Sequence, residues 1–313
     1  MGKASRTKQD VDRRARVAAQ REAARRAEQR KRIYLAGGSI LVVAIVVVAF
    51  VLVKLNSGGS SAASAPTGAA LTSVTNQVTN IPVSVTDKVA DGGVSKGIFA
   101  SAHTAADVKT VSGNLGSYMA TVNGTPLTSN GKPEVLFIGG EYCPYCAAER
   151  WAMVNAFSRF GTFTGLKTTH SSSTDVYPNT PTFTFVGATY TSKYITFTPV
   201  EQFGSSNTDI LQNPTAAQEA LATKYDLSGS IPFIDLGNKY AEVGNLLPLS
   251  PSMMTGKTWA QVATAMSNPT SSLGKALVGN ANYLTAATCV LTNNLPATAC
   301  TPAIQKLEAN LAK

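Results

Sequence analysis

The sequence predicts one N-terminal membrane-spanning helix followed by a mixed α/β domain. Two observations predict the domain. Its apolar patterns follow the order strand, helix, strand, insertion, helix, strand, strand and helices, which is typical of mixed α/β folds. The 313-residue chain is also 44% hydrophobic and only 14% charged, so it can bury a core. A third observation, a long apolar run without charges, predicts the membrane helix.

The membrane helix is predicted over residues 33–53, which include no charged side chain. As a helix this stretch is about 31 Å long at roughly 1.5 Å per residue, enough to cross a bilayer. A buried core helix is the alternative, but such helices seldom stay uncharged for so long. Arg30, Lys31 and Arg32 precede the run and Lys54 alone directly follows it, so the positive-inside rule places the N-terminus in the cytoplasm.

A cleaved signal peptide is the competing interpretation of the same region. Ala63, Ser64 and Ala65 form a small-residue cleavage site after the apolar run. The run is longer than the ~7–15 apolar residues of a signal peptide, and its basic flank is long as well. We therefore expect a retained anchor in the cell membrane, with the lipid bilayer as a partner and the C-terminal domain outside the cytoplasm.

The positive charge of the chain is concentrated in its N-terminal tail. The formal net charge is +9, of which residues 1–32 contribute +8. A protein that binds nucleic acid needs its Lys and Arg side chains on the folded body, so we expect no nucleic acid partner.

Four segments follow from these patterns. Residues 56–70 are rich in Gly, Ser and Ala and cannot bury enough apolar surface to fold. The predicted organisation is a basic cytoplasmic tail (1–32), a transmembrane helix (33–53), a flexible linker (54–70) and an extracytoplasmic domain (71–313).

The elements of the domain are predicted in chain order. Residues 71–133 have weak periodicity and many Ser, Thr and Gly residues, which favours strands and loops. Residues 134–140 form a continuous apolar run that ends in two glycines, as a buried strand should. Later patterns predict extended segments at 166–169, 182–190 and 192–200, a helix at 214–225, two strands around the turn Gly237–Asn238, and helices from Thr258 onward.

A helix is expected from about Cys143 to Phe160. Pro144 lies in its first turn, where a missing N–H does no harm, and Gly161 is a stop signal. Apolar side chains recur at helical spacing and predict its inner face. They are Ala147, Trp151, Val154 and Phe157.

Cys143 and Cys146 are the candidate reactive residues. A thiol at a helix start is stabilised as a thiolate by free backbone N–H groups and by the helix dipole, and the thiolate is the nucleophile. Cys146 lies one turn later, where it can attack a mixed disulfide formed at Cys143. Pro144 and Tyr145 fill the gap and tune the stability of the thiolate.

Other uses of the Cys-x-x-Cys pair fit less well. A structural zinc site needs two more ligands in a close pair, whereas ten residues separate Cys289 from Cys300 and His103 and His170 are in no such pattern. Haem attachment needs His at position 147, where the chain has Ala. A permanent disulfide is possible outside the cytoplasm, but a strand, a glycine loop and a helix start favour redox use. We predict no metal and no cofactor.

The residues Glu141 to Cys146, EYCPYC, between a strand and a helix resemble the active site of thioredoxin-like oxidoreductases. Cys-Pro-Tyr-Cys is familiar from glutaredoxins. The wider stretch at 130–163, together with YPNTPTFTF, SKYITFTPVE and IPFI, resembles a membrane-anchored, thioredoxin-like family of prokaryotes labelled a domain of unknown function. The likeness covers roughly residues 75 to 310 and implies a thioredoxin-like fold with an insertion and a helical C-terminal extension.

The resemblance also implies roles for individual residues. Cys143 becomes the attacking thiol and Cys146 the resolving thiol. Ile231 and Pro232 become the cis-proline loop, whose backbone pairs with a substrate chain. Pro181, after Thr180, is the rival candidate because it too precedes a strand.

Two departures limit the resemblance. Thioredoxins have a buried acid six positions before the first cysteine, where this chain has Phe137, so the proton relay is unassigned. The glutathione-binding residues of glutaredoxins are not recognisable, and glutathione is a doubtful partner outside the cytoplasm.

Cys289 and Cys300 flank a turn-rich stretch between two predicted helices. A structural disulfide there would contribute at most about 3 kcal/mol by chain entropy. The alternative is a second redox pair that exchanges electrons with Cys143 and Cys146.

Two functions are therefore predicted from different classes. The first is a membrane-anchored thiol–disulfide oxidoreductase that forms or rearranges disulfides in extracytoplasmic proteins, recycled by a membrane redox partner. The second is a non-catalytic envelope scaffold or binding protein with both cysteine pairs oxidised.

Overall fold

The computed structural model describes residues 63–94, 99–101, 118–122, 124–226 and 229–311. The predicted basic tail, the predicted transmembrane helix and most of the predicted linker lie outside these ranges. Within them, no helix combines the length and the apolar character needed to cross a membrane.

The described ranges form one mixed α/β unit. Its helices are α2 (Gly68–Thr79), α3 (Val83–Val89), α5 (Pro144–Ser158), α6 (Ala216–Tyr225), the 3-10 helix η2 (Pro251–Met254), α7 (Trp259–Met266), α8 (Ser272–Leu291) and α9 (Pro302–Leu311). Its strands are β1 (Phe99–Ser101), β2 (Tyr118–Thr121), β3 (Thr128–Ser129), β4 (Lys132–Gly139), β5 (Gly161–Thr164), β6 (Lys167–His170), β7 (Pro181–Thr184), β8 (Thr189–Ser192), β9 (Thr196–Glu201), β10 (Phe233–Leu236) and β11 (Tyr240–Val243).

The main sheet is mixed and is centred on β4. The strand order is β1-β2-β11-β10-β4-β3, and β9 also pairs with β4. Strand β9 runs parallel to β4, whereas β10 is antiparallel to it and β11 is antiparallel to β10. The register places Phe137 of β4 beside Ile234 of β10, and Ile234 beside Glu242 of β11.

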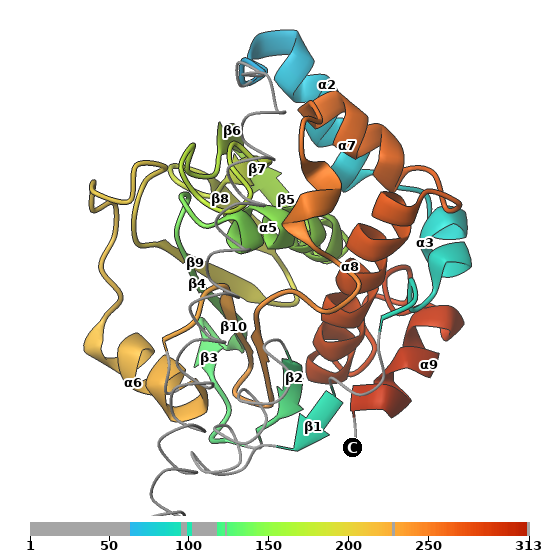
Figure 1. The fold of residues 1–313 in the computed structure, drawn as a ribbon. Helices are drawn as coiled ribbons and strands as arrows, with labels where there is room; N and C mark the ends of the chain where they lie inside the picture. Colours follow the sequence, from blue (N-terminus) through green and yellow to red (C-terminus); the bar gives the residue numbers. More distant parts are fainter. Residues whose placement is uncertain (1–62, 95–98, 102–117, 123, 227–228, 312–313) are drawn as a thin grey trace, which may run out of the picture. The chain divides into compact units, whose positions relative to one another are not determined.

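The two faces of this sheet are covered by different helices. Val135 and Phe137 belong to the larger apolar cluster, which includes α5 and α8. Leu136 and Ile138, which alternate with them, belong to a smaller cluster that includes Tyr225 of α6. Figure 1 shows α5 and α8 together and α6 on the other side of the strands. A continuous apolar run at β4 is thus explained by burial on both faces.

Helix α5 confirms the helix predicted after the apolar strand. Cys143 is its N-cap with an extended backbone, Pro144 occupies its first position, and it ends at Ser158, two residues before the predicted end. All of its residues between Cys146 and Phe157 are buried. The helix is enclosed by the sheet, α8, α2 and the insertion, so its buried surface extends beyond the predicted inner face.

The N-terminal part of the domain differs from the prediction. Strands and loops were expected over 71–133, but residues 68–79 and 83–89 form α2 and α3. Their Val and Thr residues lower helix propensity, which is why the sequence pattern is misleading. Val74 and Val78 are buried, so packing stabilises a helix that propensity does not. The predicted linker boundary at residue 70 is also too late, because α2 begins at Gly68.

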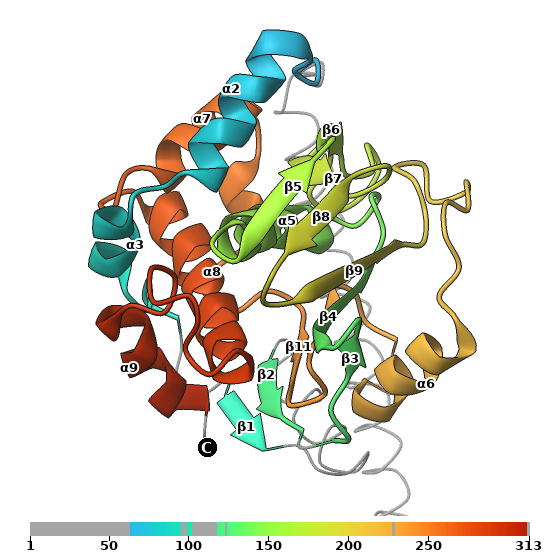
Figure 2. The ribbon, with the colours of Figure 1, turned by 180° about the vertical axis from the view of Figure 1, so that it is seen from behind.

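The predicted insertion consists of two small antiparallel pairs, β5 with β8 and β6 with β7. Figure 2 shows these strands beside α5. Trp151 of α5 donates a hydrogen bond from Nε1 to the Pro181 carbonyl at 2.8 Å, and Trp259 of α7 donates to the Thr182 carbonyl at 2.8 Å. The insertion is therefore attached to the helix that carries the two cysteines.

Candidate functional site

Cys143 and Cys146 lie where the central strand passes into helix α5. Gly139 ends the strand, Gly140 follows it, and Cys143 caps the helix. The Cys146 backbone N–H donates a hydrogen bond to the Cys143 Sγ at 3.3 Å. Both side chains are free thiols, with Cys143 5% exposed and Cys146 fully buried.

The pKa values of the two thiols are shifted in opposite directions. The hydrogen bond from the Cys146 side chain lowers the pKa of Cys143, and the backbone N–H of Cys146 and the charge of Arg150 lower it further, while burial opposes them. Burial raises the pKa of Cys146 well above its ordinary value, and the hydrogen bond to Cys143 and its charge act in the same direction. Cys143 is thus the thiol that ionises first, and Cys146 retains its proton.

The loop before β10 lies against the first cysteine. The Ile231–Pro232 peptide bond is cis, and the Ile231 carbonyl oxygen lies 3.7 Å from the Cys143 Sγ. The structure thus brings Ile231, Pro232 and Cys143 together. The rival Pro181 instead begins the buried strand β7 and accepts the hydrogen bond from Trp151.

A buried ion pair lies behind the cysteines, and sequence reasoning missed it. Arg150 donates from Nε to Glu201 Oε1 at 2.7 Å and from Nη2 to Oε2 at 2.6 Å, and both side chains are 0% exposed. The guanidinium also lies over the Phe137 ring, 5.8 Å from its centroid. A cation one turn after Cys146, in a helix rich in Ala and other apolar residues, is the signal that could have found it.

Two further carboxyl groups are buried in the same region. Glu149 accepts a hydrogen bond from the Asn245 amide at 2.8 Å, and that amide also donates to the Tyr145 carbonyl at 2.9 Å. Burial raises the pKa of Glu149 to about 7. Glu242 is fully buried without a hydrogen-bond partner for either oxygen, and burial and then the charge of Glu149 raise its pKa well above the ordinary value.

Phe137 occupies the strand position, six residues before Cys143, at which thioredoxins have a buried acid. Phe137 is fully buried and its ring packs against Phe185. Glu242 lies two strands away in the same register row. Acidic groups are therefore present under the helix, but they come from α5 and β11 rather than from β4. Sequence reasoning cannot find them because the pairing of β11 brings Glu242 there.

Tyr145 is the exposed member of the Cys-Pro-Tyr-Cys sequence. Its side chain is 39% exposed, whereas Pro144 is buried. The Tyr145 ring packs edge-on against Tyr177, with 6.0 Å between centroids. An exposed aromatic ring two residues after Cys143 is available to a bound molecule.

Cys289 and Cys300 form a disulfide. Cys289 lies in the last turn of α8, Cys300 lies two residues before α9, and both are buried. The disulfide closes the connection between these two helices.

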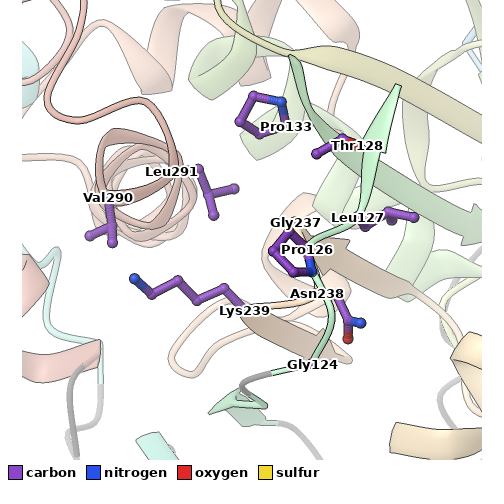
Figure 3. A pocket seen from close by; sticks show the side chains of 10 residues that line it. All are labelled: Gly124, Pro126, Leu127, Thr128, Pro133, Gly237, Asn238, Lys239, Val290 and Leu291. Atoms are coloured by element: carbon purple, nitrogen blue, oxygen red, sulfur yellow. The ribbon is translucent and has the colours of Figure 1, made fainter. Parts of the chain in front are cut away.

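A separate pocket of about 420 Å³ lies at the other end of β10. Gly237 follows β10 and lines the pocket, whereas Pro232 precedes the strand. Figure 3 shows Lys239 and two side chains of α8, Val290 and Leu291, at its wall. This pocket is not part of the cysteine site. In the described ranges, no three His, Cys, Asp or Glu side chains are grouped as metal ligands would be.

One comparison with known proteins gives a match. Residues 118–221 match the model of a family described as a domain of unknown function, DUF929. The matched stretch includes Cys143, Cys146, Arg150 and Glu201, and it ends before Pro232. The match supports the expected relation to a domain-of-unknown-function family. The comparisons with curated proteins and with solved structures give no match.

Proposed function

We propose that this chain is a membrane-anchored thiol–disulfide oxidoreductase that acts on extracytoplasmic proteins. The observation that carries the proposal is the asymmetry of one cysteine pair. Cys143 has a lowered pKa at a helix N-cap, and Cys146, directly behind it, is buried and has a raised pKa. A permanent structural disulfide has no need of this difference, whereas capture and release of a substrate do.

The strand order gives independent support. The order β9-β4-β10-β11, with β9 parallel to β4 and the next two strands antiparallel, is the arrangement expected of a thioredoxin-like fold. The reactive pair follows the central strand, and the cis-proline precedes the adjacent antiparallel strand. The expected insertion lies between α5 and β9.

Oxidation of a substrate dithiol begins from the Cys143–Cys146 disulfide. A substrate thiolate attacks the Cys143 Sγ, a substrate–Cys143 disulfide forms, and the Cys146 sulfur leaves and takes up a proton. The second substrate thiolate then attacks the substrate sulfur and releases the Cys143 thiolate. Two electrons pass from the substrate to the cysteine pair, and a membrane-bound oxidant must remove them.

The geometry favours each step of this exchange. The Cys146 backbone N–H and the charge of Arg150 stabilise the Cys143 thiolate as it leaves. The Ile231 carbonyl beside Cys143 can pair with the backbone of the bound substrate. Rearrangement of disulfides uses the same steps, beginning with attack by the Cys143 thiolate of the reduced protein on a substrate disulfide.

The decisive experiment is the reduction potential of the Cys143–Cys146 pair in the full-length protein. The protein is equilibrated in defined thiol buffers, and the two cysteine pairs are read separately by mass spectrometry. A potential between about −120 and −270 mV supports exchange, with the less negative part of the range expected for an oxidase or isomerase. A value below about −300 mV marks a structural disulfide and supports the scaffold alternative.

Trapping variants test the order of the two thiols. Cys146→Ser should accumulate a mixed disulfide with a substrate protein, because the resolving thiol is gone, whereas Cys143→Ser should trap none. Equal trapping by both variants, measured by non-reducing electrophoresis, would contradict the assigned roles.

A further inference from the structure

Exposed apolar side chains lie on segments that contact the cysteine loop. Seven large apolar side chains are exposed in the described ranges, and five of them belong to segments that contact the loop carrying the cysteines. These five, which we call the dithiol rim, are Tyr145, Val176, Ile210, Leu211 and Leu247. Grouped exposed apolar residues, unlike scattered ones, mark interaction sites.

Specific contacts attach two of these segments to the cysteine loop. The Ser172 N–H donates to the Tyr142 carbonyl at 2.8 Å, and Tyr177 packs on Tyr145, which places the segment with Val176 beside the loop. On another side, the Asn245 amide donates to the Tyr145 carbonyl at 2.9 Å, two residues before Leu247.

The third segment contacts the loop through Phe203. The Glu141 N–H donates to the Phe203 carbonyl at 2.8 Å, and the rings of Tyr142 and Phe203 pack with 6.2 Å between centroids. Phe203 forms a β-bridge with Ile210, whose side chain is 64% exposed. Three separate segments that carry rim residues therefore contact the loop and helix start that hold the cysteine pair.

The rim segments are acidic. They contain Glu141, Asp175 and Asp209 and have no Lys or Arg. Burial and then charges that include Asp175 raise the pKa of Tyr145, so this carboxylate acts at the rim. The segments considered are 140–146, 172–179, 203–212, 229–232 and 244–248.

We propose that the dithiol rim binds an extended polypeptide segment in which apolar and basic residues flank the reacting cysteine. This inference rests on the proposed function and names its substrate class. Apolar side chains of the partner would cover Val176 and Leu247, and its Lys or Arg residues would complement the three carboxylates. The acidic rim disfavours anionic lipid headgroups, and lipids have no disulfide for Cys143 to attack.

The test compares two peptide disulfides in a single turnover of the reduced full-length protein. Each peptide has one cysteine joined to a small aromatic thiol, flanked by Leu and Lys in the first peptide and by Ser and Glu in the second. The aromatic thiol leaves when Cys143 attacks the peptide sulfur, and Cys146 then releases the peptide thiol. The rate constant of each peptide with the protein is divided by its rate constant with a small dithiol in place of the protein. This ratio corrects for differences in the intrinsic reactivity of the two peptide disulfides.

We expect the Leu/Lys peptide to react at least about fivefold faster than the Ser/Glu peptide, an effect of the size expected for one important interface residue. Val176→Ser and Leu247→Ser should each lower the rate constant of the Leu/Lys peptide by about fivefold and leave that of a symmetrical small aromatic disulfide unchanged. Val83→Ser is the matched control, because Val83 is 48% exposed against 45% for Val176 but lies on α3. Asp175→Asn should reduce the preference for Lys over Glu.

The outcomes separate this inference from the proposed function. Equal corrected rates for the two peptides, or a Val176→Ser variant that behaves like Val83→Ser, overturn the rim assignment while exchange with the small disulfide sustains the function. If no disulfide reacts, the function fails. The rim is then tested with a labelled Leu/Lys peptide whose cysteine is replaced by Ala. The affinity of wild type for this peptide is compared with that of Val176→Ser.

A tryptophan at the rim identifies the occupant. In Val176→Trp, addition of the Leu/Lys peptide should shift the emission to shorter wavelength. The same shift on reconstitution into anionic lipid without peptide would assign the surface to the membrane and overturn the proposal. The same shift on raising the protein concentration alone would assign it to a second copy of the chain and would also overturn the proposal.

Discussion

At the scale of single residues, the site depends on a difference between two thiols three positions apart. Cys143 receives the free N–H groups of a helix start, and Cys146 lies one turn deeper with no exposed surface. The difference in pKa between them follows from these two positions. The Cys-Pro-Tyr-Cys spacing was enough to predict Cys143 at the helix start and Cys146 one turn later, because helix geometry is local. The complete burial of Cys146 depends on packing in the fold.

Arg150 is the residue that couples the ion pair to the thiols. Its charge lowers the pKa of both cysteines. Arg150→Met alone would leave Glu201 buried and unpaired, which costs roughly 3–5 kcal/mol. We therefore predict that Arg150→Met/Glu201→Gln folds and that the pKa of Cys143 rises in it, as measured by the pH dependence of alkylation.

Glu201→Gln is the control for this prediction, because it keeps the arginine charge near the thiols and its amide oxygen can still accept a hydrogen bond from Arg150. The control is less stable than wild type, so alkylation is measured under conditions in which all variants are folded. An unchanged alkylation profile in the double variant would show that the helix start alone sets the acidity of Cys143.

Glu149 gives the stability of the protein a predicted pH dependence. Burial raises its pKa from an ordinary value of 4.5 to about 7 in the folded chain. Between these two pH values the folded state binds more protons than the unfolded state, so its stability falls as the pH rises. The free energy of unfolding of Glu149→Gln, taken relative to that of wild type, should therefore be greater at pH 8 than at pH 5. The expected difference is a few kcal/mol.

Denaturant unfolding at the two pH values measures this difference. Glu219→Gln, an exposed change on α6, is the control and should alter stability alike at both. A gain for Glu149→Gln that is the same at pH 5 and pH 8 would contradict the predicted shift.

At the scale of elements, α2 shows how packing overrides local preference. Its sequence, GAALTSVTNQVT, has five β-branched residues in twelve, and yet it is a helix. Val74 and Val78 are buried, and the Asn155 amide of α5 donates to the Val78 carbonyl at 2.9 Å. This helix therefore supports the helix that carries the cysteines.

Val78→Ala should destabilise the protein by about 2 kcal/mol, because it removes buried methyl groups. Val83→Ala, at a half-exposed site on α3, should change stability by less than about 0.5 kcal/mol. Thermal unfolding of the two variants compares them directly. Equal midpoints would show that α2 contributes nothing to the core.

At the scale of the whole molecule, the C-terminal disulfide and the reactive pair belong to different parts of the fold. The bond between Cys289 and Cys300 closes a short connection between α8 and α9. Cys289→Ala/Cys300→Ala should lower stability by about 3 kcal/mol, as expected for so short a loop. The reduction potential of the Cys143–Cys146 pair should stay unchanged.

The rate at which the Cys143–Cys146 pair is recycled separates the two uses of this disulfide considered from the sequence. A structural disulfide affects only stability, whereas a second redox pair would change the rate at which the first pair is oxidised or reduced. Slower recycling of Cys143 and Cys146 in a membrane preparation that contains the double variant would favour the redox role.

The sequence by itself determined the features that depend on near neighbours. Apolar periodicity, glycines and capping residues predict four elements. These are the central strand, the helix that begins with the cysteines, the helix at 216–225 and the β10–β11 hairpin. The likeness of the stretch around Cys143 and Cys146 to a known kind of site is also a local property. Such signals need no knowledge of distant residues.

The tertiary structure alone decided the environment of the thiols. Arg150 meets Glu201 because β9 pairs with β4, and Glu242 lies beneath α5 because β11 pairs with β10. The helical state of α2 likewise depends on burial against other helices. These contacts join residues far apart in the chain, and their energies come from burial, which apolar periodicity and local propensity do not record.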